Sequence, residues 1–172
     1  MNICFVMYPW EKIEPGKDST LTLIHECAKR GHKVAIATPA NLTIRNSIAY
    51  GFCKVITKQE TISRSPSSFY KSAKLKEKML PLAGFDVIFM RANPPLDPIV
   101  LNFLDSVKDD VFIVNSIEGL REANNKIYTA VFDDPNNEII PVTHVSKNKE
   151  YLKETIRESN SEKMIMKPFM RP

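Results

Sequence analysis

Three groups of residues have side chains and positions that suit the binding of an anionic ligand. Asp18, Ser19 and Thr20 follow a loop with two prolines and a glycine, where a helix is expected to begin. The free N–H groups at such a helix start attract carboxylates and phosphates. The second group centres on Arg91 and Asn93, which are followed by two prolines. The guanidinium of an arginine can hold a carboxylate or phosphate through two parallel hydrogen bonds.

The third group is a pair of lysines, Lys126 and Lys167. An ammonium group is a compact point charge that suits phosphate binding. Each group also has an ordinary explanation: helix capping for Asp18, a surface ion pair for Arg91, and a solvated surface position for each lysine. We favour a binding role for Arg91, because the following prolines stiffen its surroundings. The other groups, taken singly, fit the ordinary explanation better.

No catalytic residue and no metal ligand is assigned from the sequence. The histidines share no spacing typical of a metal site, and the cysteines are too widely spaced for a CxxC motif. These residues are His25, His32 and His144, and Cys4, Cys27 and Cys53. We expect reduced and mostly buried thiols. With only five glycines, the chain has neither a GxGxxG fingerprint nor a P-loop.

Composition excludes several classes of protein. Hydrophobic residues make up 43% of the 172 residues and charged residues 26%, as in an ordinary globular protein. No apolar run approaches the roughly 18 residues of a membrane span, and the N-terminus does not resemble a signal peptide. We therefore expect a cytoplasmic protein without a membrane partner. Basic residues concentrate in residues 54–78, which we interpret as a solvated surface rather than a nucleic-acid site.

The elements that must position these groups follow an α/β pattern. Apolar runs at residues 3–8, 33–38, 85–91 and 111–114 predict buried strands, as in a parallel sheet. Helices are expected to begin at Asp18 and Asp97. An irregular hairpin over residues 41–58 and a helix over residues 70–80 complete the first part. Such a doubly wound, Rossmann-like sheet binds ligands at the carboxyl ends of its strands.

A different pattern begins near residue 116. We expect helices over residues 117–123, from about 124 to 132, and from Ser146 to about Ser159, with Tyr151, Leu152 and Ile156 facing inward. Short strands are expected over residues 139–142 and 163–167. The predicted domains are residues 1–122, with the Rossmann-like sheet, and residues 123–172.

Together and in this order, these features resemble the bacterial glutathione synthetase family of ATP-grasp ligases. The matching segments are the opening strand, residues 18–31, 85–97, 114–115 and 120–130, and Met166-Lys167-Pro168. Each segment alone is a weak signal, but their order and spacing are fairly specific. The resemblance covers nearly the whole chain but only the N-terminal half of the family's protein. It implies a Rossmann-like substrate domain followed by an incomplete ATP-grasp segment.

The resemblance also implies a reaction. ATP phosphorylates the carboxylate of γ-glutamylcysteine, and glycine attacks the acyl phosphate to give glutathione. Mg²⁺ bridges the phosphates. By resemblance, Lys126 and Lys167 contact the phosphates of ATP. The segments containing Asp18, Ser19, Thr20, Arg91 and Asn93 help to hold the peptide. A homo-oligomer is also implied.

The sequence departs from the family pattern at two places. Asn93 stands where the family usually carries an acid, which puts the exact substrate in question. Lys167-Pro168 is followed by only four residues instead of a glycine-rich loop, so the adenine-binding strands and acidic metal ligands would lie beyond them. We therefore expect this chain alone to be inactive as a ligase. The alternatives are a related ligase for another amino acid or peptide, and a non-catalytic binding module.

Overall fold

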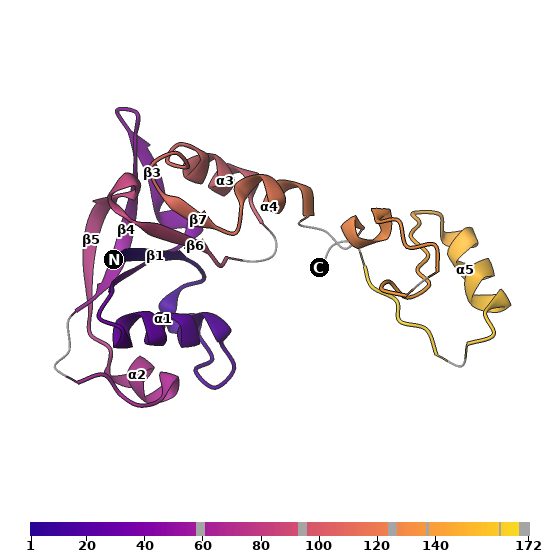
Figure 1. The fold of residues 1–172 in the computed structure, drawn as a ribbon, viewed down its shortest axis with the longest axis horizontal. Helices are drawn as coiled ribbons and strands as arrows, with labels where there is room; N and C mark the ends of the chain where they lie inside the picture. Colours follow the sequence, from indigo (N-terminus) through magenta and orange to yellow (C-terminus); the bar gives the residue numbers. More distant parts are fainter. Residues whose placement is uncertain (58–60, 93–95, 124–126, 137, 162, 169–172) are drawn as a thin grey trace. The chain divides into compact units, whose positions relative to one another are not determined.

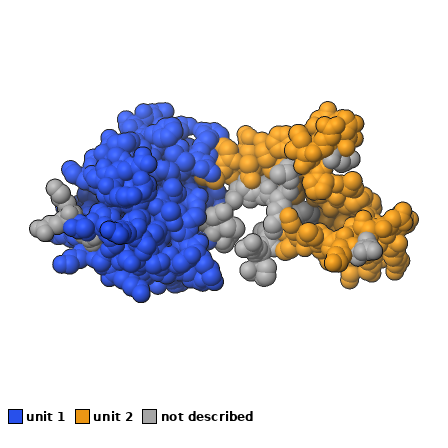
Figure 2. Space-filling view, turned by 60° about the horizontal axis from the view of Figure 1, so that its bottom comes forward, with its two compact units in different colours: residues 1–118 blue, residues 119–172 orange. Residues whose placement is uncertain are grey.

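The computed structural model describes residues 1–57, 61–92, 96–123, 127–136, 138–161 and 163–168. The chain divides into two compact units, Met1–Glu118 and Gly119–Pro172, which are coloured separately in Figure 2. The helix α4 (Ile117–Ala123) runs across this division. None of the helices formed by the described residues combines the length and apolar character that crossing a membrane requires.

The first unit contains one seven-stranded sheet. Its strands are β1 (Asn2–Val6), β2 (Lys33–Ala37), β3 (Leu42–Arg45), β4 (Ile48–Ile56), β5 (Leu75–Pro81), β6 (Val87–Met90) and β7 (Phe112–Val114). The strands β2, β1, β6 and β7 lie side by side and are parallel. β4 runs antiparallel to β2 and β3, and β5 runs antiparallel to β4. The expected α/β fold with a Rossmann-like parallel sheet is confirmed, with an antiparallel extension.

Helices cover both faces of this sheet (Figure 1). α1 (Ser19–Lys29) and α2 (Pro66–Ser72) lie on one side, and α3 (Pro98–Asp105) lies on the other. Short 3-10 turns occur at η1 (Trp10–Lys12), η2 (Pro39–Asn41) and η3 (Leu82–Gly84). Because both faces are covered, the central strands are buried on both sides. This explains the continuous apolar runs in the sequence.

The core beneath α1 and α2 is built from alternate residues of the strands. Phe5 of β1 stacks on Phe89 of β6, with ring centroids 4.8 Å apart. Leu21 and Ile24 of α1 and Phe69 of α2 are fully buried against them. The apolar residues of α1 recur at helical spacing, so they lie on the face of the helix that packs against this core.

The predicted helix over residues 70–80 is wrong. α2 ends at Ser72, and the strand β5 begins at Leu75 and pairs with β4 along its whole length. The residues of β5 have good helix propensity, but pairing with a neighbouring strand overrides such weak local preferences. The hairpin expected over residues 41–58 is formed by β3 and β4.

The second unit contains α5 (Lys149–Glu158) and the 3-10 turn η4 (Tyr128–Val131). α5 is the helix expected after Ser146, although Asn148 caps it and none of its residues is buried. Tyr151 and Ile156 are exposed, so their expected inward orientation is wrong. The described residues within 138–142 and 163–168 form no strand, so both predicted strands are also wrong.

Candidate functional site

Two of the predicted groups lie at the same edge of the sheet. β1 and β6 are parallel neighbours, so their carboxyl ends lie at the same edge of the sheet. Residues 7–18 then lead from β1 to α1, and Arg91 follows β6 directly. The backbone N–H groups of Arg91 and Ala92 both donate to the carbonyl of Val6, at 2.7 and 2.9 Å. This fixes the backbone of Arg91 beside the end of β1.

The side chain of Arg91 reaches the first turn of α1. Its Nε donates to Thr20 Oγ1 at 3.2 Å, and its Nη2 donates to Ser19 Oγ at 3.1 Å. Thr20 is buried, whereas Ser19 and Arg91 are exposed. Arg91 is more than 70 positions from Ser19 and Thr20 in the sequence, and the sheet brings them together. We call Ser19, Thr20 and Arg91 the arginine cluster.

The arginine cluster retains the capacity to bind an anion. A guanidinium carries five N–H donors, and the contacts to Ser19 and Thr20 leave further donors on Arg91. The cluster lies at the start of α1, where unpaired backbone N–H groups also favour negative charge. A carboxylate can therefore be held at this edge of the sheet by charge and by directed hydrogen bonds.

Asp18 acts as the N-cap of α1. Its Oδ1 accepts a hydrogen bond from the backbone N–H of Leu21 at 2.7 Å. The carboxylate therefore satisfies one of the unpaired donors of the helix start. Asp18 therefore lies next to the arginine cluster, and its role is helix capping, which is the ordinary explanation of this residue.

A cavity of about 260 Å³ adjoins the start of α1. Its walls come from the loop before α1, from the first turns of α1 and from the beginning of α2. The residues that form it are Pro15, Gly16, Lys17, Asp18, Ser19, Thr22, Pro66 and Ser67. Ser19 therefore belongs both to this cavity and to the arginine cluster.

The remaining predicted residues are not brought to this cluster by any described contact. Asn93 and Lys126 lie outside the described residues. Lys167 is exposed in a stretch without regular secondary structure, in the second unit. The described residues contain no group of three or more His, Cys, Asp or Glu side chains that could hold a metal ion.

The cysteines are free thiols, as expected. Cys4 and Cys53 are buried, and Cys27 is partly buried. The hydrogen bond that the Cys4 thiol shares with Cys53, together with burial, holds the pKa of Cys4 well above its ordinary value. A thiol in this state is a poor nucleophile at neutral pH.

No pattern in the sequence indicates the contacts that hold the loop before α1. Lys54 of β4 forms an ion pair with Glu11, and this contact lowers the pKa of the Glu11 carboxyl. Tyr70 of α2 donates to the carbonyl of Trp10 at 3.1 Å. Such contacts join residues that are about 40 to 60 positions apart, and no local pattern marks them.

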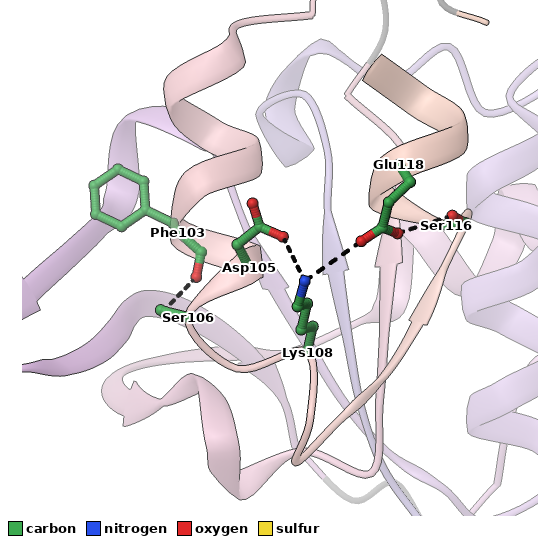
Figure 3. Close-up of polar contacts among 6 residues, drawn as sticks. All are labelled: Phe103, Asp105, Ser106, Lys108, Ser116 and Glu118. Atoms are coloured by element: carbon green, nitrogen blue, oxygen red, sulfur yellow. Dashed lines mark hydrogen bonds and ion pairs between the residues drawn. The ribbon is translucent and has the colours of Figure 1, made fainter. Parts of the chain in front are cut away.

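A second polar group lies near the end of β7 (Figure 3). Lys108 is 3.8 Å from Asp105 and 3.4 Å from Glu118, and Ser116 donates to Glu118 at 3.2 Å. A backbone hydrogen bond and the one from Ser116 lower the pKa of the Glu118 carboxyl. The positive charge of Lys108 is balanced by two carboxylates, so this group is not an anion site. Its contacts connect α3 to the start of α4.

These features define a class of protein. The first unit is a doubly wound α/β domain with an arginine and a helix start at the carboxyl edge of its parallel strands. Domains of this kind bind small ligands at that edge. The arginine cluster makes a ligand with a carboxylate or phosphate the best match.

Comparison with known proteins identifies the family. Residues 1–121 match the family model described as the N-terminal domain of prokaryotic glutathione synthetase, and the chain belongs to this family. Similar proteins include the glutathione synthetases of Synechocystis sp. (29% identical), Vibrio cholerae (30%) and Escherichia coli O6:H1 (32%). Each match covers 98% of this chain but only 51–53% of the relative. The chain therefore spans about half the length of these curated relatives.

Proposed function

We propose that this chain provides the peptide-binding domain of a glutathione synthetase-like ligase. The reaction transfers the γ-phosphoryl group of ATP to the cysteinyl carboxylate of γ-glutamylcysteine. The amine of glycine then attacks the acyl phosphate, an amide bond forms, and inorganic phosphate leaves. The observation that carries this proposal is the arginine cluster at the carboxyl edge of the sheet, in a domain of this family.

The arginine cluster supplies binding and orientation. Arg91 holds a carboxylate of the dipeptide, because its guanidinium is permanently charged and matches the geometry of a carboxylate. Ser19 and Thr20 accept hydrogen bonds from Arg91 and so fix the plane of the guanidinium. Fixing this plane before the ligand arrives lowers the entropy lost on binding. Asn93 is proposed to contact the same substrate.

ATP and Mg²⁺ are proposed for the whole enzyme. Lys126 and Lys167 are the proposed contacts to the phosphates of ATP. Among the described residues, no group of three or more His, Cys, Asp or Glu side chains could hold a metal ion, and Lys167 is exposed. We therefore propose that the 172-residue chain binds the dipeptide but does not turn over ATP. Release of ADP from ATP, γ-glutamylcysteine and glycine in its presence would contradict this part.

Calorimetric titration of the chain with γ-glutamylcysteine tests the binding role. The Arg91→Lys variant keeps the positive charge but loses the planar fork, and we expect its affinity to fall about tenfold or more. Arg45→Lys, at an exposed arginine of β3, is the matched control and leaves affinity unchanged. Equal affinities for the wild type and Arg91→Lys would contradict the role of Arg91.

A second candidate is a ligase of the same kind that acts on another amino acid or peptide. Asn93, which replaces an acidic residue of the family pattern, favours it. A panel of dipeptides with and without the γ-linkage distinguishes the two candidates. Tighter binding of γ-glutamylcysteine than of every other member supports the first candidate. Preference for another peptide supports the second.

A further inference from the structure

The loop between β1 and α1 (residues 7–18) is held from one side by α2. Within it, Trp10 and Ile13 are buried, with 7% and 8% of their surface exposed. The rings of Trp10 and Tyr70 stack with centroids 4.9 Å apart, and Tyr70 Oη donates to the carbonyl of Trp10 at 3.1 Å. Ser67 Oγ donates to the carbonyl of Pro15 at 3.1 Å. α2 therefore contacts this loop at Trp10 and at Pro15, five residues apart.

β4 provides a third attachment. Lys54 forms an ion pair with Glu11, which directly follows Trp10. The polar attachments thus come from segments that are distant in the sequence, and they hold the loop at Trp10, Glu11 and Pro15. A loop of this length is ordinarily mobile unless other segments hold it.

α2 is itself fixed to α1 and to the core. Phe69 is fully buried, and its ring lies 5.2 Å from that of His25 on α1. His25 Nε2 lies 2.7 Å from the carbonyl of Ser63, just before α2. Ser65 caps α2 by accepting a hydrogen bond from the N–H of Ser68. The loop therefore contacts α2, and α2 in turn contacts α1.

The arginine cluster lies at the end of this loop. Residues 14–18 form backbone hydrogen bonds that lead directly into the start of α1, including one from Asp18 to Glu14 at 3.1 Å. A displacement of the loop at Trp10 or Pro15 would move Ser19 and Thr20 relative to Arg91. Arg91 is fixed separately, by its backbone hydrogen bond to Val6.

We propose that Tyr70 and Ser67 are positioning residues, which hold the loop so that Ser19 and Thr20 keep the guanidinium of Arg91 in its binding orientation. They act through the loop, because no described contact joins them to Arg91. The consequence for dipeptide binding rests on the proposed function. The consequence for the orientation of Arg91 does not depend on it.

The test measures hydrogen exchange in the intact chain by NMR, at the Nε–H of Arg91 and the backbone N–H of Leu21. Tyr70→Phe retains the ring and removes the hydroxyl, and Ser67→Ala removes the other hydrogen bond. We expect each variant to increase exchange at both groups by about three- to tenfold. Tyr50→Phe, at a half-buried tyrosine of β4, is the control and leaves both rates unchanged.

A purely structural role gives a different result. General destabilisation would increase exchange equally at the β1–β6 amides, such as that of Phe89, and would overturn the proposal. Unchanged exchange at Arg91 Nε–H in both variants would also overturn it. Selective acceleration at Arg91 and Leu21 supports it. If γ-glutamylcysteine does not bind even the wild type, the proposed function fails, and the exchange rates still decide the role of Tyr70 and Ser67.

Discussion

At the scale of single residues, the arginine cluster shows how position turns ordinary side chains into a candidate site. Ser19 and Thr20 would be unremarkable in the first turn of any helix. They gain a specific role because both accept hydrogen bonds from Arg91. The sequence predicted each of these residues as a candidate, since they follow predicted strands at the expected edge. It could not predict which atoms would pair, because side-chain pairing depends on the packing of α1 against the sheet.

Asp134 gives a pH-dependent prediction in the second unit. Its carboxylate accepts backbone hydrogen bonds from Ile140 at 2.7 Å, Ile139 at 3.1 Å and Glu138 at 3.2 Å. The bond from Ile140, followed by the other two, lowers the pKa of Asp134. At pH values above the ordinary pKa of an aspartate, the lowered pKa contributes stability to the folded loop. This stability is lost as the pH falls through the lowered value.

We therefore expect the amide resonance of Ile140 to shift with a midpoint below the ordinary pKa of aspartate. Asp134→Asn should abolish this titration, because the amide group stays uncharged across the range. Asp133→Asn, at the adjacent position, is the control and should preserve it. A midpoint at or above the ordinary value in the wild type would contradict the assigned hydrogen bonds.

At the scale of elements, two helix caps allow the structural and binding roles of Asp18 to be separated. Asp18 caps α1 and Asp97 caps α3, each by accepting from a backbone N–H, at 2.7 and 2.8 Å. Loss of such a cap costs about 0.5–2 kcal/mol. We expect Asp18→Ala and Asp97→Ala to lower the free energy of unfolding by similar amounts in denaturant titrations.

Only the change at α1 should alter the arginine cluster. Asp18→Ala is expected to weaken binding of γ-glutamylcysteine, since Ser19 and Thr20 lie in the turn that loses its cap. Asp97→Ala should leave binding unchanged. If both variants bind equally well, the start of α1 does not contribute to the site.

The packing between β4 and its neighbours gives a prediction for Gly51. A Cβ atom at this position would lie 3.0 Å from Cys53 Sγ and 3.4 Å from Leu82 Cδ2. Overpacking of this kind typically costs about 1–3 kcal/mol. We expect Gly51→Ala to destabilise the protein, as measured by urea unfolding. In a Cys53→Ala background the same change should cost less than half as much, whereas an equal cost would exclude Cys53 as the cause.

The sequence predicted the parallel part of the sheet better than the antiparallel part. Strands β1, β2 and β6 are predictable because burial on both faces produces continuous apolar runs. β7 lies at the edge of the sheet and Phe112 is exposed, but its three residues are all apolar. β5 is not predictable because three consecutive charged residues (76–78) separate Leu75 from Met79 and Leu80, and its pairing with β4 is not visible locally. The strands expected in the second unit failed for a related reason. Short apolar runs such as residues 139–142 form strands only when a neighbouring strand pairs with them.

At the scale of the whole molecule, the two units differ in how their helices are supported. α1 buries Thr20, Leu21, Ile24 and His25, whereas α5 buries none of its residues. An isolated helix of ten residues is only marginally stable in water. We expect backbone amides of α5 to exchange about a hundredfold faster than those of β1 or β6. Slow exchange throughout α5 would show that another surface covers its apolar side chains.

We propose that the carboxyl edge of the sheet, with Arg91 at its centre, binds γ-glutamylcysteine. The most direct measurement is a ¹⁵N-resolved NMR titration of the 172-residue chain with this dipeptide. We predict saturable shifts at the Nε–H of Arg91 and at the amides of Ser19 and Thr20, and no such shifts at these amides in Arg91→Lys. Saturable shifts confined to other segments, or no binding at millimolar dipeptide, would contradict this role of Arg91.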